Sequence, residues 1–175
     1  MARLNDLMLE GAVIGYKNFR GERSNFNSNG ERHFSVFFEE AQAQELADLG
    51  YNVKFPVQDP DSPYEKKPHL QVTVRFNPVP PEVWMIADGN MTRLNEATID
   101  ILDRAVIQNV DLIINPYRWE RETKQGVTTG IKAYAKKLFV TIETDAFQKK
   151  YGHMMPTEGM PADQGPDFGD YDVPF

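Results

Sequence analysis

Apolar and polar side chains alternate along His33–Phe38 and His69–Asn77. A period of two is typical of a β-strand with one buried face. Three further segments, rich in Val, Ile and Tyr, are also predicted strands: Met8–Phe19, Val106–Trp119 and Ile131–Glu143. To the core we assign the apolar residues Phe34, Val36, Phe38, Leu70, Val72, Val74, Phe76 and Trp84.

Shorter elements lie between these strands. Glu39–Leu49 is rich in helix formers and is followed by Gly50, a residue that often ends helices. Asn95–Arg104 predicts a second, short helix. The other predicted elements are a strand at Tyr51–Val57 and a hairpin of Val83–Ala87 and Met91–Leu94 around Asp88-Gly89-Asn90. Polar stretches with Ser, Asn, Gly or Pro predict loops at Arg20–Glu31, Gln58–Pro68 and Glu120–Gly130.

Two irregularities are expected in the last two strands. Pro116 lacks a backbone N–H, which favours a bulge or an edge position. In Ile131–Glu143 one extra residue near Lys137 would keep all apolar side chains on one face, as a β-bulge does. The apolar positions there change from odd to even: Ile131, Ala133 and Ala135, then Leu138, Val140 and Ile142.

The order of elements predicts a mainly β protein with a five-stranded oligonucleotide-binding (OB) barrel. A helix lies between strands 3 and 4, a helix and strand are inserted after strand 2, and the hairpin is an addition. OB barrels bind ligands on the strand 2–3 face and between the loops that join strands 1–2 and 4–5. We expect this domain to span residues 1–151, ending in a short helical segment, and residues 152–175 to be a disordered acidic tail.

Charge and composition narrow the function. The net charge of −7 argues against nucleic acid at first, but residues 153–175 contain five of the 26 acids and no Lys or Arg. The rest of the chain, with 19 basic and 21 acidic groups, is therefore nearly neutral and can carry a local basic groove. The absence of cysteine excludes disulfides and thiol chemistry. We expect a cytoplasmic protein, because no apolar run approaches the ~20 residues of a membrane span and no signal peptide is evident.

Basic and aromatic residues are interleaved in the two loop regions that would border the ligand site. Cations follow phosphates and aromatic rings stack on unpaired bases, so this combination indicates binding of single strands. On the last strand, Lys132, Tyr134 and Lys136 are expected to point outward together. The predicted DNA-binding residues are Lys17, Phe19, Arg20, Arg23, Phe26, Arg32, Arg75, Tyr117, Arg118, Trp119, Arg121, Lys124, Lys132, Tyr134 and Lys136.

Enzymatic chemistry has little support in the sequence. There is no phosphate-binding Gly-Lys-Ser/Thr loop and no His-Glu metal motif. His33 and His69 are interpreted as outward-facing strand residues. No catalytic residue, metal site or cofactor is predicted.

The last nine residues alternate acids with aromatic residues and stop on an apolar Pro-Phe, which is typical of a docking peptide. The predicted partner-binding residues are Asp167, Phe168, Asp170, Tyr171, Asp172, Val173, Pro174 and Phe175. This tip resembles the acidic C-terminal tip of bacterial-type single-stranded DNA-binding proteins, with Val173 in place of Ile. The segments NVDLIINPYRWE (109–120) and GIKAYAKKLFVTIE (130–143) are similar to bacteriophage single-stranded DNA-binding proteins with an OB fold.

That resemblance implies a protein that coats single-stranded DNA during phage replication, recombination and repair and recruits protein partners through its tip. It would act in the host cytoplasm, without catalysis, either alone or as a homo-oligomer. Two alternatives stay open: an OB-fold adaptor that binds no nucleic acid, with Tyr117, Trp119 and Tyr134 buried, and an RNA-binding protein.

Overall fold

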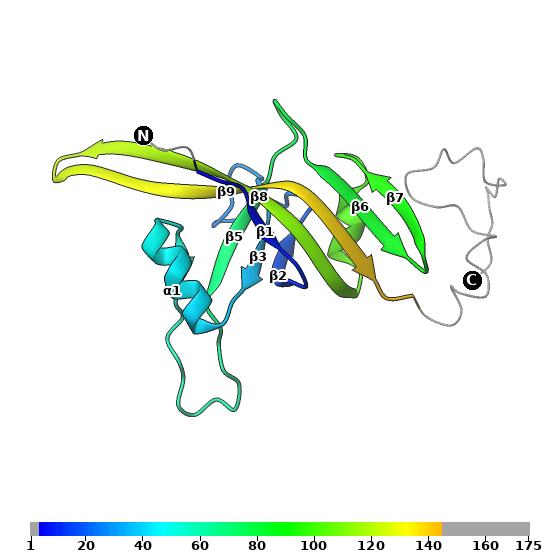
Figure 1. Cartoon of the computed structure of the whole chain (residues 1–175), viewed down its shortest axis with the longest axis horizontal. Coiled ribbons are helices and arrows are strands. Elements are labelled where there is room, and N and C mark those ends of the chain that lie inside the picture. Colours follow the sequence, from blue (N-terminus) through cyan, green and yellow to red (C-terminus); the bar gives the residue numbers. More distant parts are fainter. Residues whose placement is uncertain (1–3, 145–175) are drawn as a thin grey trace.

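The strands join into one mixed sheet (Figure 1). The computed structural model describes residues 4–144. Its elements are β1 (Leu7–Leu9), β2 (Val13–Asn18), β3 (Arg32–Phe37), α1 (Glu40–Leu49), β4 (Val53–Lys54), β5 (His69–Val74), β6 (Glu82–Ala87), β7 (Asn90–Leu94), the 3-10 helix η1 (Ile99–Asp103), β8 (Ile107–Thr123) and β9 (Gly126–Ile142). The main ladder runs β1-β8-β9-β5-β3-β2, with β4 paired to β5 and β6 paired to both β7 and β9.

The architecture confirms the mainly β, OB-like class. The five predicted principal strands correspond to β1 with β2, then β3, β5, β8 and β9, and η1 lies between the third and the fourth. The two ends of the ladder, β1 and β2, are consecutive in the chain. Within the described residues no pairing joins β1 to β2, so the sheet stays open and the barrel is not closed.

The first predicted strand, Met8–Phe19, is wrong as a single element. Gly11 has a φ of +62°, a left-handed conformation that suits glycine and breaks the strand. Its N–H donates to Asp111 Oδ1 over 2.8 Å, and the N–H of Ala12 donates to the Val110 carbonyl over 2.8 Å. The break lets the two pieces pair with different strands: β1 pairs with β8, and β2 pairs with β3.

The bulge predicted near Lys137 is confirmed. Ile113 pairs with Lys137, whereas the next residue, Ile114, pairs with Ala135, so Lys136 is the additional residue. The side chains of Ala135 and Leu138 on either side of the bulge are both buried. Pro116 pairs regularly with β9, so there is no bulge at this residue. On its other side β8 has no partner among the described residues, because the pairing with β1 ends at Ile114. Pro116 therefore has the predicted edge position.

The predicted loop at Glu120–Gly130 is wrong, because β8 and β9 continue as paired strands up to a turn at Lys124-Gln125. We call residues 117–130 the hairpin arm; it extends well away from the rest of the sheet (Figure 1). Most of its side chains are exposed on both faces, so it has no apolar alternation, and the sequence shows only its polarity.

The smaller elements follow the predictions with changed lengths. Helix α1 ends at Gly50, whose φ of +108° allows the N–H groups of the cap to reach the carbonyls of Leu46 and Ala47. The β6–β7 hairpin forms as expected. The strand predicted at Tyr51–Val57 is only two residues long, and the helix predicted at Asn95–Arg104 is one 3-10 segment.

The core lies on one side of the sheet and contains Phe34, Val36, Leu70, Val72 and Val74 as predicted. Trp84 is a correction, since it is half-buried: its Nε1 donates to Glu82 Oε2 over 2.8 Å, and the Arg93 guanidinium lies 5.6 Å from its ring centroid. Within the described part of the chain, no helix is long and apolar enough to cross a membrane.

Candidate nucleic-acid interface

The side of the sheet opposite the core gathers most of the aromatic and polar candidates. Cross-strand partners project from the same face, so the register identifies the members of this surface. We call it the open face, and it consists of His33, Ser35 and Phe37 on β3, His69, Gln71, Thr73 and Arg75 on or just after β5, Lys132 and Tyr134 on β9, and Asn115, Tyr117 and Trp119 on β8.

Three rings cluster where the hairpin arm leaves the sheet, and we call them the arm platform. Tyr117 is 58% exposed, and its ring meets the half-buried Tyr134 edge-on at a centroid distance of 6.4 Å. The third ring, Trp119, lies flat against its cross-strand partner Gly130, where an added Cβ would be only 2.6 Å from the indole Cζ2. A bare backbone at Gly130 thus provides the room for the indole.

Two cations border the arm platform and share one carboxylate. The Arg75 guanidinium lies 5.0 Å and the Lys132 ammonium 5.5 Å from the Tyr134 ring centroid. Glu31 Oε2 is 3.2 Å from Lys132 Nζ and 4.0 Å from Arg75 Nη2. The two cations that face the ring therefore share the single negative charge of Glu31, which offsets only part of their combined charge.

Other predicted cations divide into paired and unpaired groups. Arg32 pairs with Glu96 and Lys136 with Asp6. By contrast, five exposed members of the predicted set have no ion pair with any acid among residues 4–144: Arg20, Arg23, Arg118, Arg121 and Lys124. The exposed predicted cations without an acidic partner thus lie in the 20–31 loop and on the hairpin arm.

Strand alternation separates some candidates from the open face. Arg32 pairs with Val74 and Arg118 with Ile131, both core-side residues, so each points to the opposite side from the rings. Arg121 lies on the ring side, with its guanidinium 6.0 Å from the Trp119 ring centroid. Lys124 is in the turn at the end of the hairpin arm.

Two predicted residues serve the fold instead. Phe19 is fully buried and stacks on Phe34 at 5.3 Å, so its ring cannot meet a base. The Lys17 ammonium donates to the carbonyls of Leu102 and Ala105 over 2.8 and 2.9 Å. Burial lowers the pKa of Lys17, and the nearby Asp103 carboxylate offsets part of that effect. Both predictions are corrected: these residues connect β2 and the start of the loop to η1.

The 20–31 loop keeps its other candidates at the surface. The Asn27 side-chain amide donates to the carbonyls of Glu22 and Glu31, each over 2.9 Å, which fixes the shape of the loop. Phe26 is fully exposed beside this brace, and Arg20 and Arg23 are exposed as well. The loop therefore presents one ring and two cations.

Sequence reasoning missed three rings of this surface: Tyr16, Phe37 and His69. Their centroids lie 5.4 to 5.7 Å apart. The available signal was the alternation in β3, because Phe37 has the opposite parity to the core residues Phe34 and Val36. Thr73 belongs to the same face but is almost fully buried by its neighbours.

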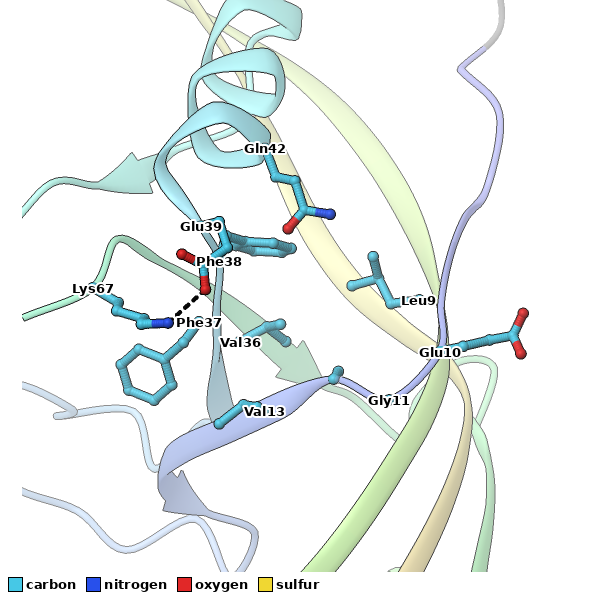
Figure 2. Close-up of a pocket in the computed structure, with 11 residues that line it drawn as sticks. Leu9, Glu10, Gly11, Val13, Val36, Phe37, Phe38, Glu39, Gln42 and Lys67 are labelled. Atoms are coloured by element: carbon cyan, nitrogen blue, oxygen red, sulfur yellow. Dashed lines mark hydrogen bonds and ion pairs between the residues drawn. The ribbon is translucent and has the colours of Figure 1, made fainter.

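A hollow of about 340 Å³ lies between the β1–β2 break, the end of β3 and the start of α1 (Figure 2). Glu10 and Glu39 line it, and its Lys67 ammonium is already bonded to Glu39. The acidic residues make this hollow unsuited to phosphate.

The predicted tip, residues 167–175, lies outside the described residues.

Comparison with known proteins places this geometry in context. The family model described as a putative phage ssDNA-binding domain matches residues 1–171. None of the curated proteins compared with the chain matches it significantly.

The chain is also similar to solved structures of phage proteins. The single-stranded DNA-binding protein from bacteriophage Enc34 in complex with ssDNA superposes with a TM-score of 0.50 at 12% identity, over 81% of this chain and 89% of that one. A C-terminal truncation of the Enc34 protein gives 0.47 at 12% identity, over 80% and 87%. The gp2.5 single-stranded DNA-binding protein of bacteriophage T7 gives 0.41 at 7% identity, over 92% and 100%. The family model matches nearly the whole length of this chain, and we therefore conclude that the chain belongs to the phage ssDNA-binding domain family.

Proposed function

We propose that the chain binds single-stranded DNA with little sequence preference, across its open face and along the hairpin arm. The observation that carries this proposal is the arm platform, where three partly exposed rings stand among cations on an OB-like sheet. Stacking on such rings is worth ~1–3 kcal/mol per base and accepts any base, because every base has an aromatic face. The family to which the chain belongs supports the same function.

The two halves of a nucleotide would meet different parts of the surface. Bases stack on Tyr117, Trp119 and Tyr134. Phosphates contact the unpaired cations of the hairpin arm and the 20–31 loop, since those of the sheet are held by acids such as Glu31. This division predicts binding with only a moderate dependence on salt. Few cations of the protein are free to neutralise phosphates, so few counterions are released from the DNA.

We further propose the wider role expected from the sequence. The protein would coat single strands during phage DNA replication, recombination and repair in the host cytoplasm, without catalysis or a cofactor. Its last nine residues, 167–175, would recruit protein partners. A chain cut after residue 166 should bind single-stranded DNA more tightly at low salt, because the acidic segment that competes with DNA is gone, and should lose the capture of replication proteins from infected cells. Capture that persists would contradict the role of the tip.

The adaptor alternative predicts buried rings in the arm platform, whereas Tyr117 is mostly exposed. The RNA alternative differs only in the polymer, and competition between DNA and RNA oligomers of matched sequence decides it.

Titration of labelled oligo-dT, in a series of salt concentrations, tests the proposed function. We expect affinity to fall by about 0.7 log units per log unit of salt for each phosphate contact, and duplex of equal length to bind more weakly. Replacing Tyr117 by Ala should weaken oligo-dT binding by about 1–3 kcal/mol. Affinity that is indifferent to salt, or equal for duplex, would rule the proposal out.

A further inference from the structure

A second group of rings lies on the open face, away from the hairpin arm. Tyr16 contacts Phe37 and His69 at centroid distances of 5.7 and 5.4 Å, and Phe37 lies 5.7 Å from His69. Tyr16 is 68% exposed, while Phe37 and His69 are half-buried. We call these three residues the β2–β3 platform.

The backbone is distorted where it presents Tyr16. The register of β2 against β3 shifts between Gly15 and Asn18, and Tyr16 has a φ of +48°, a conformation that side chains other than Gly, Asn and Asp rarely adopt. A bulge re-aims the side chain it carries, and here the redirected ring contacts Phe37 and His69. Backbone strain retained to display an exposed ring points to binding rather than to core packing.

The β2–β3 platform is built like the arm platform. A Cβ added to Gly15 would lie 2.7 Å from Phe37 Cε2, just as one added to Gly130 would lie 2.6 Å from Trp119 Cζ2. Figure 2 shows the rings of Phe37 and Phe38 pointing to different sides of β3, and only Phe38 joins the core. In both platforms, a glycine on the neighbouring strand leaves space for a ring on the open face.

A groove of about 270 Å³ extends from the arm platform toward the β2–β3 platform. Trp119 of the arm platform lines one part of it, and Lys54 lines another. Lys54 is the cross-strand partner of His69 and has no ion pair with any acid in the described part of the chain. Between them the groove carries hydrogen-bonding side chains on β5 and β9, namely Gln71, Thr73 and Lys132.

The separation of the platforms suits one continuous strand. Tyr134 pairs with Thr73, and His69 precedes Thr73 by four residues in β5. Strand spacings of ~4.8 Å and rises of ~3.3 Å per residue place the platforms roughly 15 Å apart. OB folds engage about 4–16 nucleotides, so a strand of that length can span both.

We propose that Tyr16, Phe37 and His69 form a second stacking subsite for bases of the same single strand, with Lys54 contacting a phosphate beside it. The inference rests on the proposed function. It adds that binding has two stacking centres on the open face, with the groove reaching from Trp119 to Lys54 beside the second, so that affinity rises in a second step once an oligonucleotide is long enough to reach the second centre.

The test is a length series of labelled oligo-dT, from about 4 to 16 nucleotides, with wild type and Tyr16→Asn. Asparagine tolerates the left-handed backbone of this position. The short oligomers should bind both proteins equally, and the longest should bind the variant about tenfold more weakly. Tyr64→Asn is the matched control, because Tyr64 is also a largely exposed tyrosine but lies in the 58–68 loop.

His69→Ala and Lys54→Gln give independent measurements if Tyr16→Asn unfolds more easily. His69→Ala should reproduce the length-dependent loss, and Lys54→Gln should make the salt dependence shallower by about 0.7 for long oligomers alone. If wild type binds no oligo-dT, the proposed function itself fails. If wild type binds and these variants match it at every length, the second subsite is refuted while single-strand binding stands.

Discussion

In the proposed interface, Glu31 is the residue that we expect to limit the affinity for DNA most directly. Its carboxylate contacts the Lys132 and Arg75 cations, and its side chain is 29% exposed. A phosphate approaching Tyr134 must replace this carboxylate, because the same two cations border the ring. Since partly exposed ion pairs contribute only ~0–1 kcal/mol to stability, the contact has more consequence for binding than for folding.

Glu31→Gln should therefore bind oligo-dT more tightly than wild type, with a salt dependence steeper by up to about 1.4 for two released cations. The melting temperature should change little. Glu45→Gln, on the exposed side of α1, removes the same charge away from the open face and should leave both quantities unchanged. Equal or weaker binding by Glu31→Gln would show that the carboxylate does not compete with phosphate.

At the scale of elements, the hairpin arm is the part that we expect to serve binding more than folding. Its paired strands carry Tyr117, Trp119 and Arg121 on the ring side, and most of its other side chains are exposed. Such a segment adds little buried apolar area, so the core should not depend on its outer half.

Removal of residues 121–128, with Glu120 joined to Thr129 by Asn-Gly, should leave a folded protein with weaker binding at low salt. Loss of Arg121 and Lys124 should also make the salt dependence shallower by about 1.4. Shortening the exposed 58–68 loop by residues 59–64 serves as the control. Unaltered affinity and salt dependence after removal of residues 121–128 would exclude the hairpin arm from the interface.

Elements in contact with the core could be predicted from the sequence, whereas those outside it could not. Burial dictates which positions of β3, β5 and β9 are apolar, so even the bulge at Lys136 was detectable from a change of parity. The hairpin arm has no buried face, so its polarity was interpreted as a loop. The break at Gly11 was missed because both pieces, β1 and β2, have the composition of a strand.

The candidate site depends on the whole molecule, because its rings come from strands distant in sequence. Clustered basic and aromatic residues identified Tyr117, Trp119 and Tyr134. Composition alone could not distinguish Phe19, which is in the core, from Phe37, which is on the open face. Only the pairing of β3 with β5 and of β5 with β9 places the two platforms on one surface.

The balance of charge is also a property of the whole molecule. Residues 1–152 are nearly neutral. Of the sheet cations, Arg75 and Lys132 share Glu31, and Lys136 pairs with Asp6. Long-range attraction to DNA should therefore be weak, and stacking should supply a large share of the affinity.

Fluorescence of Trp119 tests the central claim, that bases stack on the open face, most directly. The chain has two tryptophans, so Trp84→Phe leaves Trp119 as the only indole. We predict that oligo-dT quenches its emission to saturation, at the same concentrations at which a labelled oligomer binds, and that duplex of equal length does not. Emission from Trp119 that stays constant while the labelled oligomer binds would contradict the account.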